Sequence, residues 1–509
     1  MNKEAFIQLK NITKTFGTVV ANSNINLTVR KGEVMALLGE NGSGKSTLMN
    51  VLSGVYMPDS GSVFIDGKEV VFRSPKDSIK TGIGMIHQHF KLVDVFTAKE
   101  NIIIGQRGSF FIKPKVLSEK IRKISQRFGL DIDPDKKVYN MSVGEKQTVE
   151  ILKVLYRGSE ILILDEPTAV LTPQEIKKLF LIIRRMKEEG CAVIIITHKL
   201  NEVMEISDRI TVLRKGEAVS TVETRSTNIK QLTELMVGHP IDLAIDRLPT
   251  DKNEIALEVN ELTAIDEEKV EVLKGVSFQI AKGEILGVAG VAGSGQKELC
   301  EALVGLYPVK SGDILFEGEN IVGKNPRDII KKGISMSFIP EDRLGMGLVA
   351  SMDMVDNMIL KDYQNQKGFL IDRSSAKAKS EMLIKKLDIK TPSIYHPVKQ
   401  LSGGNIQKVL LGRELESKPN LLITAYPVRG LDIGASYTIY DLLNGQKMKN
   451  VAILFIGEDL DVLLELCDRI MVLCNGAVMG IVDAAGTTKE QLGLMMAGEA
   501  LSQGGESNV

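Results

Sequence analysis

The sequence predicts an α/β fold made of two consecutive domains that share one architecture. Its length of 509 residues exceeds what a single hydrophobic core usually supports. Two glycine-rich loops, at residues 39–46 and 290–296, each follow an apolar strand and open a helix. A constant register of 260 positions relates Ser142 to Ser402, Pro167 to Pro427 and Asp208 to Asp468. We therefore expect one domain at residues 1–240, a linker at 241–254 and a second domain at 255–509.

The elements of the first half recur in the second. Strands are expected at residues 6–12, 24–29 and 34–38 and a helix at 45–52, and then again at 255–262, 276–280, 285–288 and 297–304. The dipeptides Asp66-Gly67 and Glu317-Gly318 indicate a hairpin after each helix. Apolar runs at 161–164, 193–196, 421–423 and 452–456 are typical of buried strands in a mostly parallel sheet. Mainly helical stretches at 88–142 and 343–402 complete each domain, which thus combines a mostly parallel core, an antiparallel β subdomain and a helical insertion.

Composition and charge exclude several classes of protein. Lysine and arginine number 64 against 65 acidic residues, and no long basic run occurs, so no nucleic-acid partner is expected. The four cysteines lack C-x-x-C spacing, which favours a reduced, cytosolic setting. The N-terminus has no apolar signal-peptide core, and the apolar runs are far shorter than the ~20 residues that span a bilayer.

The first glycine-rich loop satisfies the phosphate-loop pattern G-x-x-x-x-G-K-[ST] in full. Its backbone N–H groups can cradle phosphates, Lys45 can reach the outer phosphates, and the hydroxyl of Ser46 can bind Mg²⁺. The second loop has Gln296 where the lysine charge is needed, and Lys297 stands one position later, in the place of the metal ligand. Lys297 can partly neutralise a nucleotide, or it is a solvent-facing helix charge. A glycine-rich turn without a ligand is an alternative for the second loop.

Two carboxylates follow the apolar strand at 161–164. Asp165 can hold Mg²⁺ at the strand end, and Glu166 can polarise a water for attack on a γ-phosphate. A pair of solvated acids is the alternative, but the phosphate loop upstream favours catalysis. At the same register Ala425 and Tyr426 replace the two acids, so the second half should hold neither a metal ligand nor a base.

Two further polar positions point to the same chemistry. His198 ends another buried strand and can orient the attacking water, although a lone histidine there is more often structural. Glu458 replaces it in the second half. Gln88 can contact Mg²⁺ or the water, with a surface polar cluster as the alternative, and Glu341 lies roughly opposite it in the repeat.

The segment Ser402-Gly403-Gly404-Asn405 precedes a helix expected from about Ile406. A serine and bare glycine amides at a helix N-terminus can bind an anion, whereas the alternative is an ordinary N-cap. In the first half, Ser142, Val143 and Glu145 place a side chain and a negative charge where a phosphate would approach.

Phe16 stands before the first loop. It can stack on an adenine ring, or it is a partly buried strand residue. Glu267 takes its place in the second half.

These motifs together resemble the ATP-binding cassette family over essentially the entire chain. In that family two cassettes pair head to tail, and ATP lies between the phosphate loop of one and the signature serine and glycines of the other. The resemblance implies that Lys45, Gln88, Glu166 and His198 act in catalysis, and that Ser46, Gln88 and Asp165 surround Mg²⁺. It implies that ATP is bound by Phe16, Gly39, Glu40, Asn41, Gly42, Ser43, Gly44, Lys45, Ser46, Thr47, Ser402, Gly403, Gly404 and Asp432.

The same resemblance implies a second, degenerate site that does not hydrolyse ATP. Thr172 stands there in place of the opposing aspartate. The other residues of this site would be Gln296, Lys297, Glu341, Ala425, Tyr426, Glu458, Ser142 and Val143.

Two fused cassettes with a short linker resemble the ATPase subunit of bacterial monosaccharide-type importers, and the segments 87–90, 290–296 and 427–432 resemble the nucleoside-importer branch. The resemblance implies import of a nucleoside or related small molecule, with integral-membrane permease subunits and an extracytoplasmic substrate-binding protein as partners. It places the chain at the cytoplasmic face of the cell membrane as a peripheral protein. A monosaccharide or riboflavin is the alternative cargo. A soluble tandem-cassette ATPase that acts on ribosomes or DNA is less favoured, because such proteins carry a long charged linker and two working sites.

Overall fold

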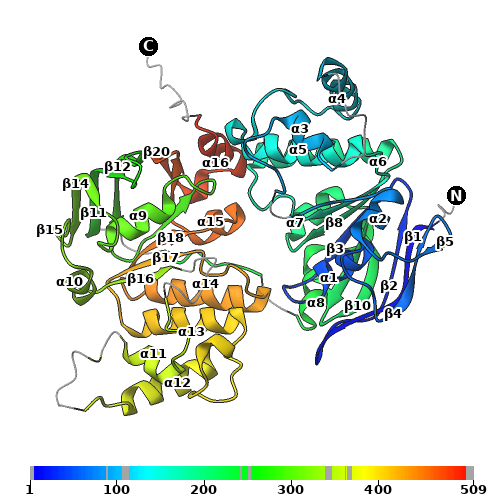
Figure 1. The fold of residues 1–509 in the computed structure, drawn as a ribbon. Coiled ribbons are helices and arrows are strands. Elements are labelled where there is room, and N and C mark those ends of the chain that lie inside the picture. The colour runs from blue at the N-terminus through cyan, green and yellow to red at the C-terminus, as the bar shows by residue number, and fades with distance from the viewer. Residues whose placement is uncertain are drawn as a thin grey trace. The chain divides into compact units, whose positions relative to one another are not determined.

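The computed structural model describes residues 5–87, 90–105, 114–240, 243–249, 254–338, 347–360, 363 and 370–499. The chain forms two compact units, residues 1–242 and 243–509. Each unit contains one four-stranded and one six-stranded sheet, together with helices (Figure 1). In the described residues, no helix is both long enough and apolar enough to cross a bilayer.

The described residues of unit 1 form ten strands and eight α-helices. Its strands are β1 (Ala5–Phe16), β2 (Val19–Arg30), β3 (Val34–Leu38), β4 (Ser60–Ile65), β5 (Lys68–Val70), β6 (Ile83–Ile86), β7 (Ile161–Asp165), β8 (Ala192–Thr197), β9 (Arg209–Arg214) and β10 (Glu217–Glu223). Its α-helices are α1 (Lys45–Leu52), α2 (Pro75–Lys80), α3 (Ala98–Ile103), α4 (Pro114–Phe128), α5 (Val143–Tyr156), α6 (Pro173–Glu188), α7 (Leu200–Ile206) and α8 (Ile229–Val237).

Unit 2 repeats this order of elements. Its strands are β11 (Ile255–Ile265), β12 (Glu271–Ala281), β13 (Ile285–Ala289), β14 (Val309–Phe316), β15 (Glu319–Asn320), β16 (Ile334–Phe338), β17 (Leu421–Ala425), β18 (Ala452–Ile456), β19 (Arg469–Cys474) and β20 (Ala477–Asp483). Its α-helices are α9 (Gln296–Leu303), α10 (Pro326–Lys331), α11 (Met354–Ile359), α12 (Ser374–Lys386), α13 (Gly403–Glu416), α14 (Ile433–Lys447), α15 (Leu460–Leu466) and α16 (Lys489–Met496).

The six-stranded sheets bring the loops after three strands to one edge. Their strand orders are β10-β9-β3-β8-β7-β6 in unit 1 and β20-β19-β13-β18-β17-β16 in unit 2, so the two topologies match. In unit 1, β3, β8 and β7 are parallel neighbours, with Leu38 opposite Thr197 and Asp165 opposite Ile196. Because the carboxyl ends of parallel strands share one sheet edge, the loops after these strands converge there.

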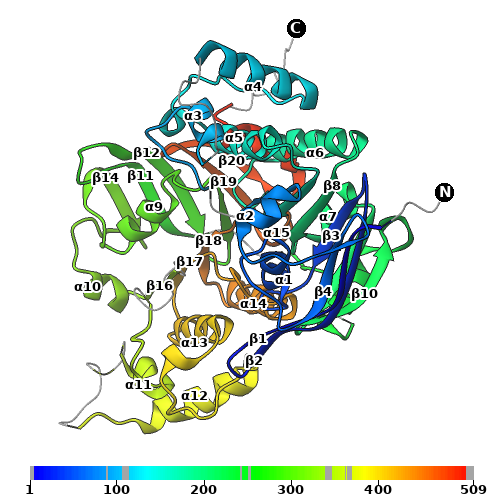
Figure 2. The same ribbon diagram turned by 45° about the vertical axis from the view of Figure 1, so that its right-hand side comes forward.

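Continuous burial explains the apolar runs in the sequence. Every residue of β3, β8, β13 and β18 is buried, as expected for central strands covered on both faces. In unit 2, helix α9 lies between the four-stranded sheet and strands β16–β18, and one apolar core joins all three (Figures 1 and 2). Helices α11 and α12 lie beyond α13 and form a smaller core with it.

An aspartate fixes the same corner of each sheet. Asp208 accepts a hydrogen bond from Lys187 Nζ (2.6 Å) and from the backbone N–H of Val34 (2.9 Å). Asp468 likewise accepts from Lys447 Nζ (2.8 Å) and from the N–H of Ile285 (2.9 Å). Because one carboxylate joins a helix to the start of a central strand, both sheets are held in the same frame.

The predicted hairpins are confirmed, and one helix starts earlier than expected. Asp66 (φ 49°) and Gly67 (φ 74°) join β4 to β5, and Glu317 and Gly318 repeat these positive φ angles between β14 and β15. Two successive positive φ values define the type I′ turn that the dipeptides predict. Helix α13 begins at Gly403 rather than near Ile406.

Candidate functional site

The first glycine-rich loop is held close to strand β2. Gly44 has φ 97° and precedes α1, and its carbonyl accepts a hydrogen bond from Asn22 Nδ2 (3.1 Å). A Cβ on Gly44 would lie 2.4 Å from the carbonyl oxygen of Ala21. Gly42 also has a positive φ of 79°, but a Cβ there would meet no atom within 4 Å. Residues 39–46 therefore form a tight turn whose shape depends on glycine at position 44.

Lys45 lies folded over this loop. Its side chain is buried, and Nζ donates to the carbonyl oxygens of Gly39 (2.6 Å) and Glu40 (2.8 Å). Burial lowers the pKa of Lys45, while the negative charges of Glu166 and Asp165 oppose that shift. The ammonium is thus close to the acids after β7, and it can exchange two carbonyl partners for a phosphate.

The acids after β7 and the histidine after β8 come together. Glu166 Oε1 lies 2.9 Å from His198 Nδ1, and the N–H of Glu166 donates to the carbonyl of Ile196 (2.9 Å). Glu166 has φ 48°, a left-handed conformation that a non-glycine residue rarely adopts. Its Oε2 is buried and has no hydrogen-bond partner in the described part of the chain. One carboxylate oxygen is therefore oriented by His198, and the other can accept a hydrogen bond from a water.

Asp165 ends β7 beside these groups. Burial and, next, the charge of Glu166 raise the pKa of its carboxyl to about 6, while the charge of Lys45 opposes the shift. A buried carboxylate with a raised pKa is stabilised by a nearby cation. Asp165 thus suits a bound divalent ion as well as the ammonium of Lys45.

The second loop has the same backbone and a different side chain. Gly295 (φ 101°) precedes α9 as Gly44 precedes α1. Gln296 is buried, and its Nε2 donates to the carbonyl of Val291 (3.1 Å), so the amide closes the loop without a charge. Lys297 is 56% exposed and lies 3.8 Å from Glu301 one helical turn away, as a charge on the helix surface would.

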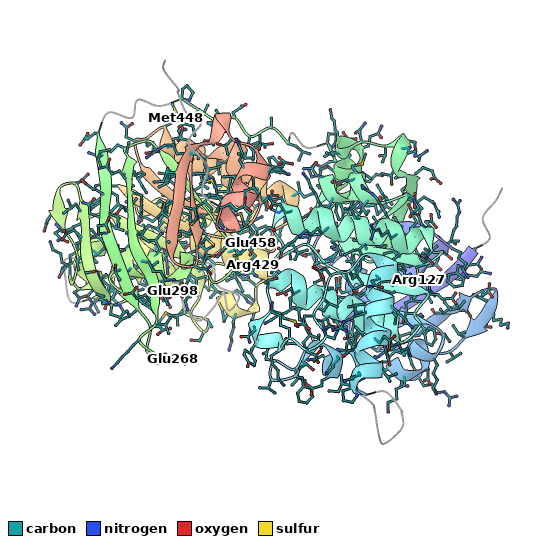
Figure 3. The ribbon with its side chains drawn as sticks, turned by 90° about the horizontal axis from the view of Figure 1, so that it is seen from above. Arg127, Glu268, Glu298, Arg429, Met448 and Glu458 are labelled. Atoms are coloured by element: carbon teal, nitrogen blue, oxygen red, sulfur yellow. The ribbon has the colours of Figure 1, made fainter. Side chains whose placement is uncertain are left out.

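An ionic and aromatic cluster takes the place of the acids and histidine in unit 2. Arg429 Nε lies 3.5 Å from Glu458 Oε1, and its guanidinium lies 5.9 Å from the centre of the Tyr426 ring (Figure 3). Tyr426 has φ 53° and donates its N–H to the carbonyl of Ile456 (2.8 Å), as Glu166 does in unit 1. Burial raises the pKa of the Tyr426 hydroxyl to about 12. Unit 2 therefore keeps the backbone of the site and replaces its acid and base groups; Ala425 is a buried strand end.

The N-termini of α5 and α13 differ in their hydrogen bonds. Ser142 and Glu145 form a capping box, in which Ser142 Oγ accepts from the N–H of Glu145 (3.2 Å) and Glu145 Oε2 accepts from the N–H of Ser142 (2.8 Å). Val143 packs against the core of unit 1. Ser402 is exposed and makes no such bond to its own helix. The first turn of α13, which begins at Gly403 and Gly404, is therefore open to a ligand, and that of α5 is closed by its own side chains.

Three other predicted residues have clear positions, and two do not. Asp432 caps α14 by accepting from the N–H of Ala435 (2.7 Å), and Thr172 caps α6 with Glu175. Phe16 is 43% exposed at the end of β1 and packs edge to face on Tyr56, with ring centres 5.2 Å apart. Gln88 and Glu341 lie outside the described residues.

The sequence did not predict Asn22, Tyr56 or Arg429 as parts of these sites. Asn22 and Tyr56 belong to no local motif, and only their positions in the fold bring them to the loop and to Phe16. Arg429 stands three residues after Tyr426, and its partner Glu458 was expected only as a replacement for histidine. An acidic residue in the place of a histidine indicates that a compensating cation lies nearby.

A phosphate loop, an acid pair and a histidine at one edge of a mostly parallel sheet define a nucleotide-hydrolysing protein of the phosphate-loop class. The ABC transporter family model matches residues 22–169 and 273–427, one match in each unit. This chain belongs to the ABC transporter family. Members of this family are ATPases that bind ATP with Mg²⁺, and the half-buried Asp165 and the hydroxyl of Ser46 are oxygen ligands of the kind Mg²⁺ prefers.

Several curated relatives match over nearly the full chain. The nucleoside import ATP-binding protein NupA of Lactococcus lactis is 42% identical, over 99% of this chain and 100% of the relative. The guanosine import ATP-binding protein NupO of Bacillus subtilis is 43% identical with the same coverage. A glucose import ATP-binding protein of Haloferax volcanii is 38% identical over 98% of this chain and 96% of the relative.

Proposed function

We propose that this chain is the ATP-hydrolysing subunit of an importer and that its cargo is a nucleoside or a closely related molecule. The contact between Glu166 and His198, beside an intact phosphate loop, carries the proposal of hydrolysis. The names of the two nucleoside and guanosine importers, at 42% and 43% identity over 99% of the chain, support the cargo. A monosaccharide is the second candidate, because the relatives also include importers named for glucose, xylose and ribose.

The residues of unit 1 divide the work of hydrolysis. The amides of residues 39–46 and Lys45 hold the phosphates, and Lys45 exchanges its two loop carbonyls for phosphate oxygens. Asp165, Ser46 and Gln88 would hold Mg²⁺, which would supply positive charge to neutralise the phosphates. Glu166 accepts a proton from the attacking water, and His198 fixes the orientation of its carboxylate.

Only one of the two possible sites is proposed to be productive. We propose that the halves pair head to tail, so that Ser402, Gly403, Gly404 and Asp432 complete the site of unit 1. The open N-terminus of α13 supports this assignment, because unpaired first-turn N–H groups attract an anion. The site opposite the capping box would lack lysine, acid pair and histidine, and the buried amide of Gln296 supports its assignment as inert. Phe16 is proposed to stack on the adenine ring of the productive site.

The importer requires partners that carry the cargo across the membrane. We propose that its partners are integral-membrane permease subunits and an extracytoplasmic protein that delivers the cargo. Conformational changes at the nucleotide site would be transmitted to the permease subunits. The ATPase would act at the cytoplasmic face of the cell membrane, bound to the permease as a peripheral subunit. We also propose that the first domain ends at residue 240 and that the second begins at residue 255.

Glu166→Gln tests the assignment of the productive site. Turnover of ATP by the full chain should fall by about 10²–10³-fold, because one positioned catalytic group is lost while the site keeps its shape. Tyr426→Phe, at the equivalent position of unit 2, is the matched control and should change turnover by less than about twofold. Turnover that survives in Glu166→Gln would reject the single-site proposal.

Uptake measurements test the cargo. Cells that lack this gene should lose uptake of radiolabelled nucleoside, and uptake should return with the wild-type gene but not with Glu166→Gln. Unchanged nucleoside uptake together with lost monosaccharide or riboflavin uptake would replace the cargo and leave the ATPase assignment intact. Co-purification of the chain with a polytopic membrane protein would separate the importer from a soluble ATPase that acts on ribosomes or DNA.

A further inference from the structure

The amide of Asn405 joins a loop of the helical insertion to the hydroxyl of Ser402. The backbone N–H of Lys390 donates to Asn405 Oδ1 (2.9 Å), and Asn405 Nδ2 donates to Ser402 Oγ (2.8 Å). A backbone N–H can only donate, so the oxygen of the amide must face Lys390 and its nitrogen must face Ser402. Ser402 Oγ is therefore an acceptor in this contact, and its own hydrogen points to another acceptor.

We infer that Asn405 is a positioning residue that makes the Ser402 hydroxyl a donor to the γ-phosphate. The inference rests on the proposed function, in which Ser402 faces the nucleotide of the productive site. In the described part of the chain, the side-chain hydrogen bond of Ser402 is the one that it accepts from Asn405, so its own hydrogen has no protein acceptor there. Asn405 thus sets the direction of a hydrogen bond without touching the nucleotide.

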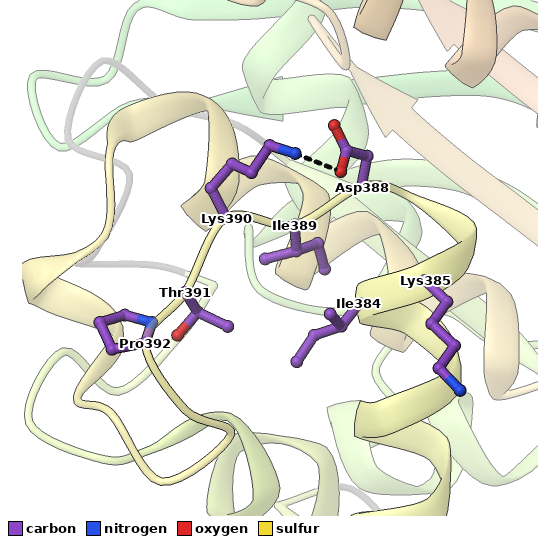
Figure 4. Close-up of a pocket in the computed structure, with 7 residues that line it drawn as sticks. All are labelled: Ile384, Lys385, Asp388, Ile389, Lys390, Thr391 and Pro392. Atoms are coloured by element: carbon purple, nitrogen blue, oxygen red, sulfur yellow. Dashed lines mark hydrogen bonds and ion pairs between the residues drawn. The ribbon is translucent and has the colours of Figure 1, made fainter.

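The loop that holds Asn405 is itself fixed to α13. Asp388 and Lys390 form an ion pair (2.6 Å) at the surface, as Figure 4 shows. Lys408, one turn after Asn405, donates from Nζ to the carbonyl of Asp388 (3.3 Å). Ile389 is buried in the core that α11, α12 and α13 share. The contacts of Ile389 and Lys408 therefore fix the loop that contains the N–H of Lys390. This N–H in turn orients the Asn405 amide.

The equivalent residue of unit 1 shows the opposite arrangement. Glu145 occupies the third position of α5, as Asn405 does in α13; its backbone N–H donates to Ser142 Oγ, and its carboxylate accepts from the N–H of Ser142. Lys136 Nζ fixes the Glu145 carboxylate at 2.6 Å. The N-terminus of α5 is thus closed by a capping box, whereas at α13 the side chain of the third residue donates to the serine hydroxyl instead.

Asn405→Asp reverses the polarity of the contact without changing the shape of the side chain. One carboxylate oxygen still accepts from the N–H of Lys390, but the other can only accept, so the Ser402 hydrogen turns inward. We expect kcat/KM for ATP to fall about ten- to a hundredfold in the full chain. The melting temperature should stay the same or rise, because an acid in the first turn stabilises a helix. A merely structural role of Asn405 would lower the melting temperature instead.

A double-mutant cycle distinguishes the proposed effect of Asn405 on the Ser402 hydroxyl from simple charge repulsion. In the Ser402→Ala background the hydroxyl is absent, so Asn405→Asp should cause at most about a twofold further loss of kcat/KM. Repulsion between the new carboxylate and the phosphates would persist in that background. Lys390→Ala is the matched control: it keeps the backbone N–H and removes only an exposed ion pair, while Ile389 and Lys408 still hold the loop, so kcat/KM should stay within about twofold.

The outcomes distinguish this inference from the proposed function. Loss of turnover in Glu166→Gln and Ser402→Ala, with wild-type kcat/KM in Asn405→Asp, would overturn only the positioning role of Asn405. Equal effects of Asn405→Asp in both backgrounds would also overturn it. Wild-type turnover in both Glu166→Gln and Ser402→Ala would overturn the assignment of the nucleotide site. The positioning role of Asn405 would then be overturned as well.

Discussion

At the scale of single residues, the ionisation of Asp165 lowers the stability of the nucleotide-free protein. Its pKa of about 6, against an ordinary value of 3.8, means that the native state binds the proton more tightly than the unfolded chain. The contribution of Asp165 to stability is therefore fully present below pH 3.8 and is lost as the pH rises through 6. Such a cost is typical of a site that is prepared for a cation.

Asp165→Asn should therefore stabilise the nucleotide-free chain at pH 8, where wild-type Asp165 is ionised. Calorimetry should show a melting temperature higher by a few degrees, and this gain should shrink as the pH is lowered from 8 to 5. The same variant should lose Mg²⁺-dependent turnover. A gain that is independent of pH would show that the ionisation of Asp165 is not its cause.

Residue types were predictable from sequence, but their hydrogen-bond partners were not. The spacing of Lys45, Asp165, Glu166 and His198 relative to apolar strands predicts one sheet edge, and the contact between Glu166 and His198 agrees with that. No spacing rule shows that the Lys45 ammonium binds two loop carbonyls or that Arg429 pairs with Glu458. These contacts depend on side-chain rotamers in the folded protein, which the order of residues alone does not specify.

At the scale of the element, the first phosphate loop makes unequal demands on its glycines. Gly44→Ala must place a Cβ 2.4 Å from the Ala21 carbonyl oxygen and also hold φ 97°. Gly42→Ala must hold only a positive φ of 79°, with no atom within 4 Å of the new carbon. A left-handed alanine costs roughly 1 kcal/mol, and the steric clash adds to that.

Denaturant unfolding without nucleotide should show the difference between these two variants. Gly42→Ala should lower the free energy of unfolding of unit 1 by about 1 kcal/mol, and Gly44→Ala by more than about 2 kcal/mol. Equal losses in the two variants would mean that the packing against β2 does not shape the loop.

Elements with strong local signals were predictable, and helix starts were less so. The continuous apolar runs and the two type I′ turns identify the central strands and hairpins correctly. Helix α13 begins at Gly403, although glycine disfavours helices and the sequence favours a start near Ile406. The close packing of Gly404 against Leu431, where a Cβ would lie 3.2 Å from Cδ2, gives a tertiary reason for this start.

At the scale of the whole molecule, the proposed asymmetry predicts a stoichiometry. The chain has two units of matching topology, and the groups that we propose for hydrolysis, Lys45, Asp165, Glu166 and His198, belong to unit 1. After turnover is stopped with vanadate in the presence of Mg²⁺, about one ADP should remain trapped per chain. Trapping close to two per chain would show that the loop with Gln296 is also productive.

Nucleotide binding without metal tests the unit that is proposed to be inert. The ion pair of Lys297 with Glu301 supports a surface role, so EDTA should leave the second loop empty. Mass spectrometry of the full chain under nondenaturing conditions would count the bound nucleotides. A second nucleotide retained in EDTA, and lost in Lys297→Ala, would instead support neutralisation by this lysine.

Tyr426 has the left-handed backbone of Glu166 and donates its N–H to the neighbouring strand in the same way. A bulky aromatic residue has no conformational preference for such torsion angles, so the turn is imposed by the surrounding sheet. The backbone thus has the same form in the two units, although the side chains at this position differ. A comparison of torsion angles between the two units therefore identifies Tyr426 as the structural counterpart of Glu166, although the two side chains share no chemistry.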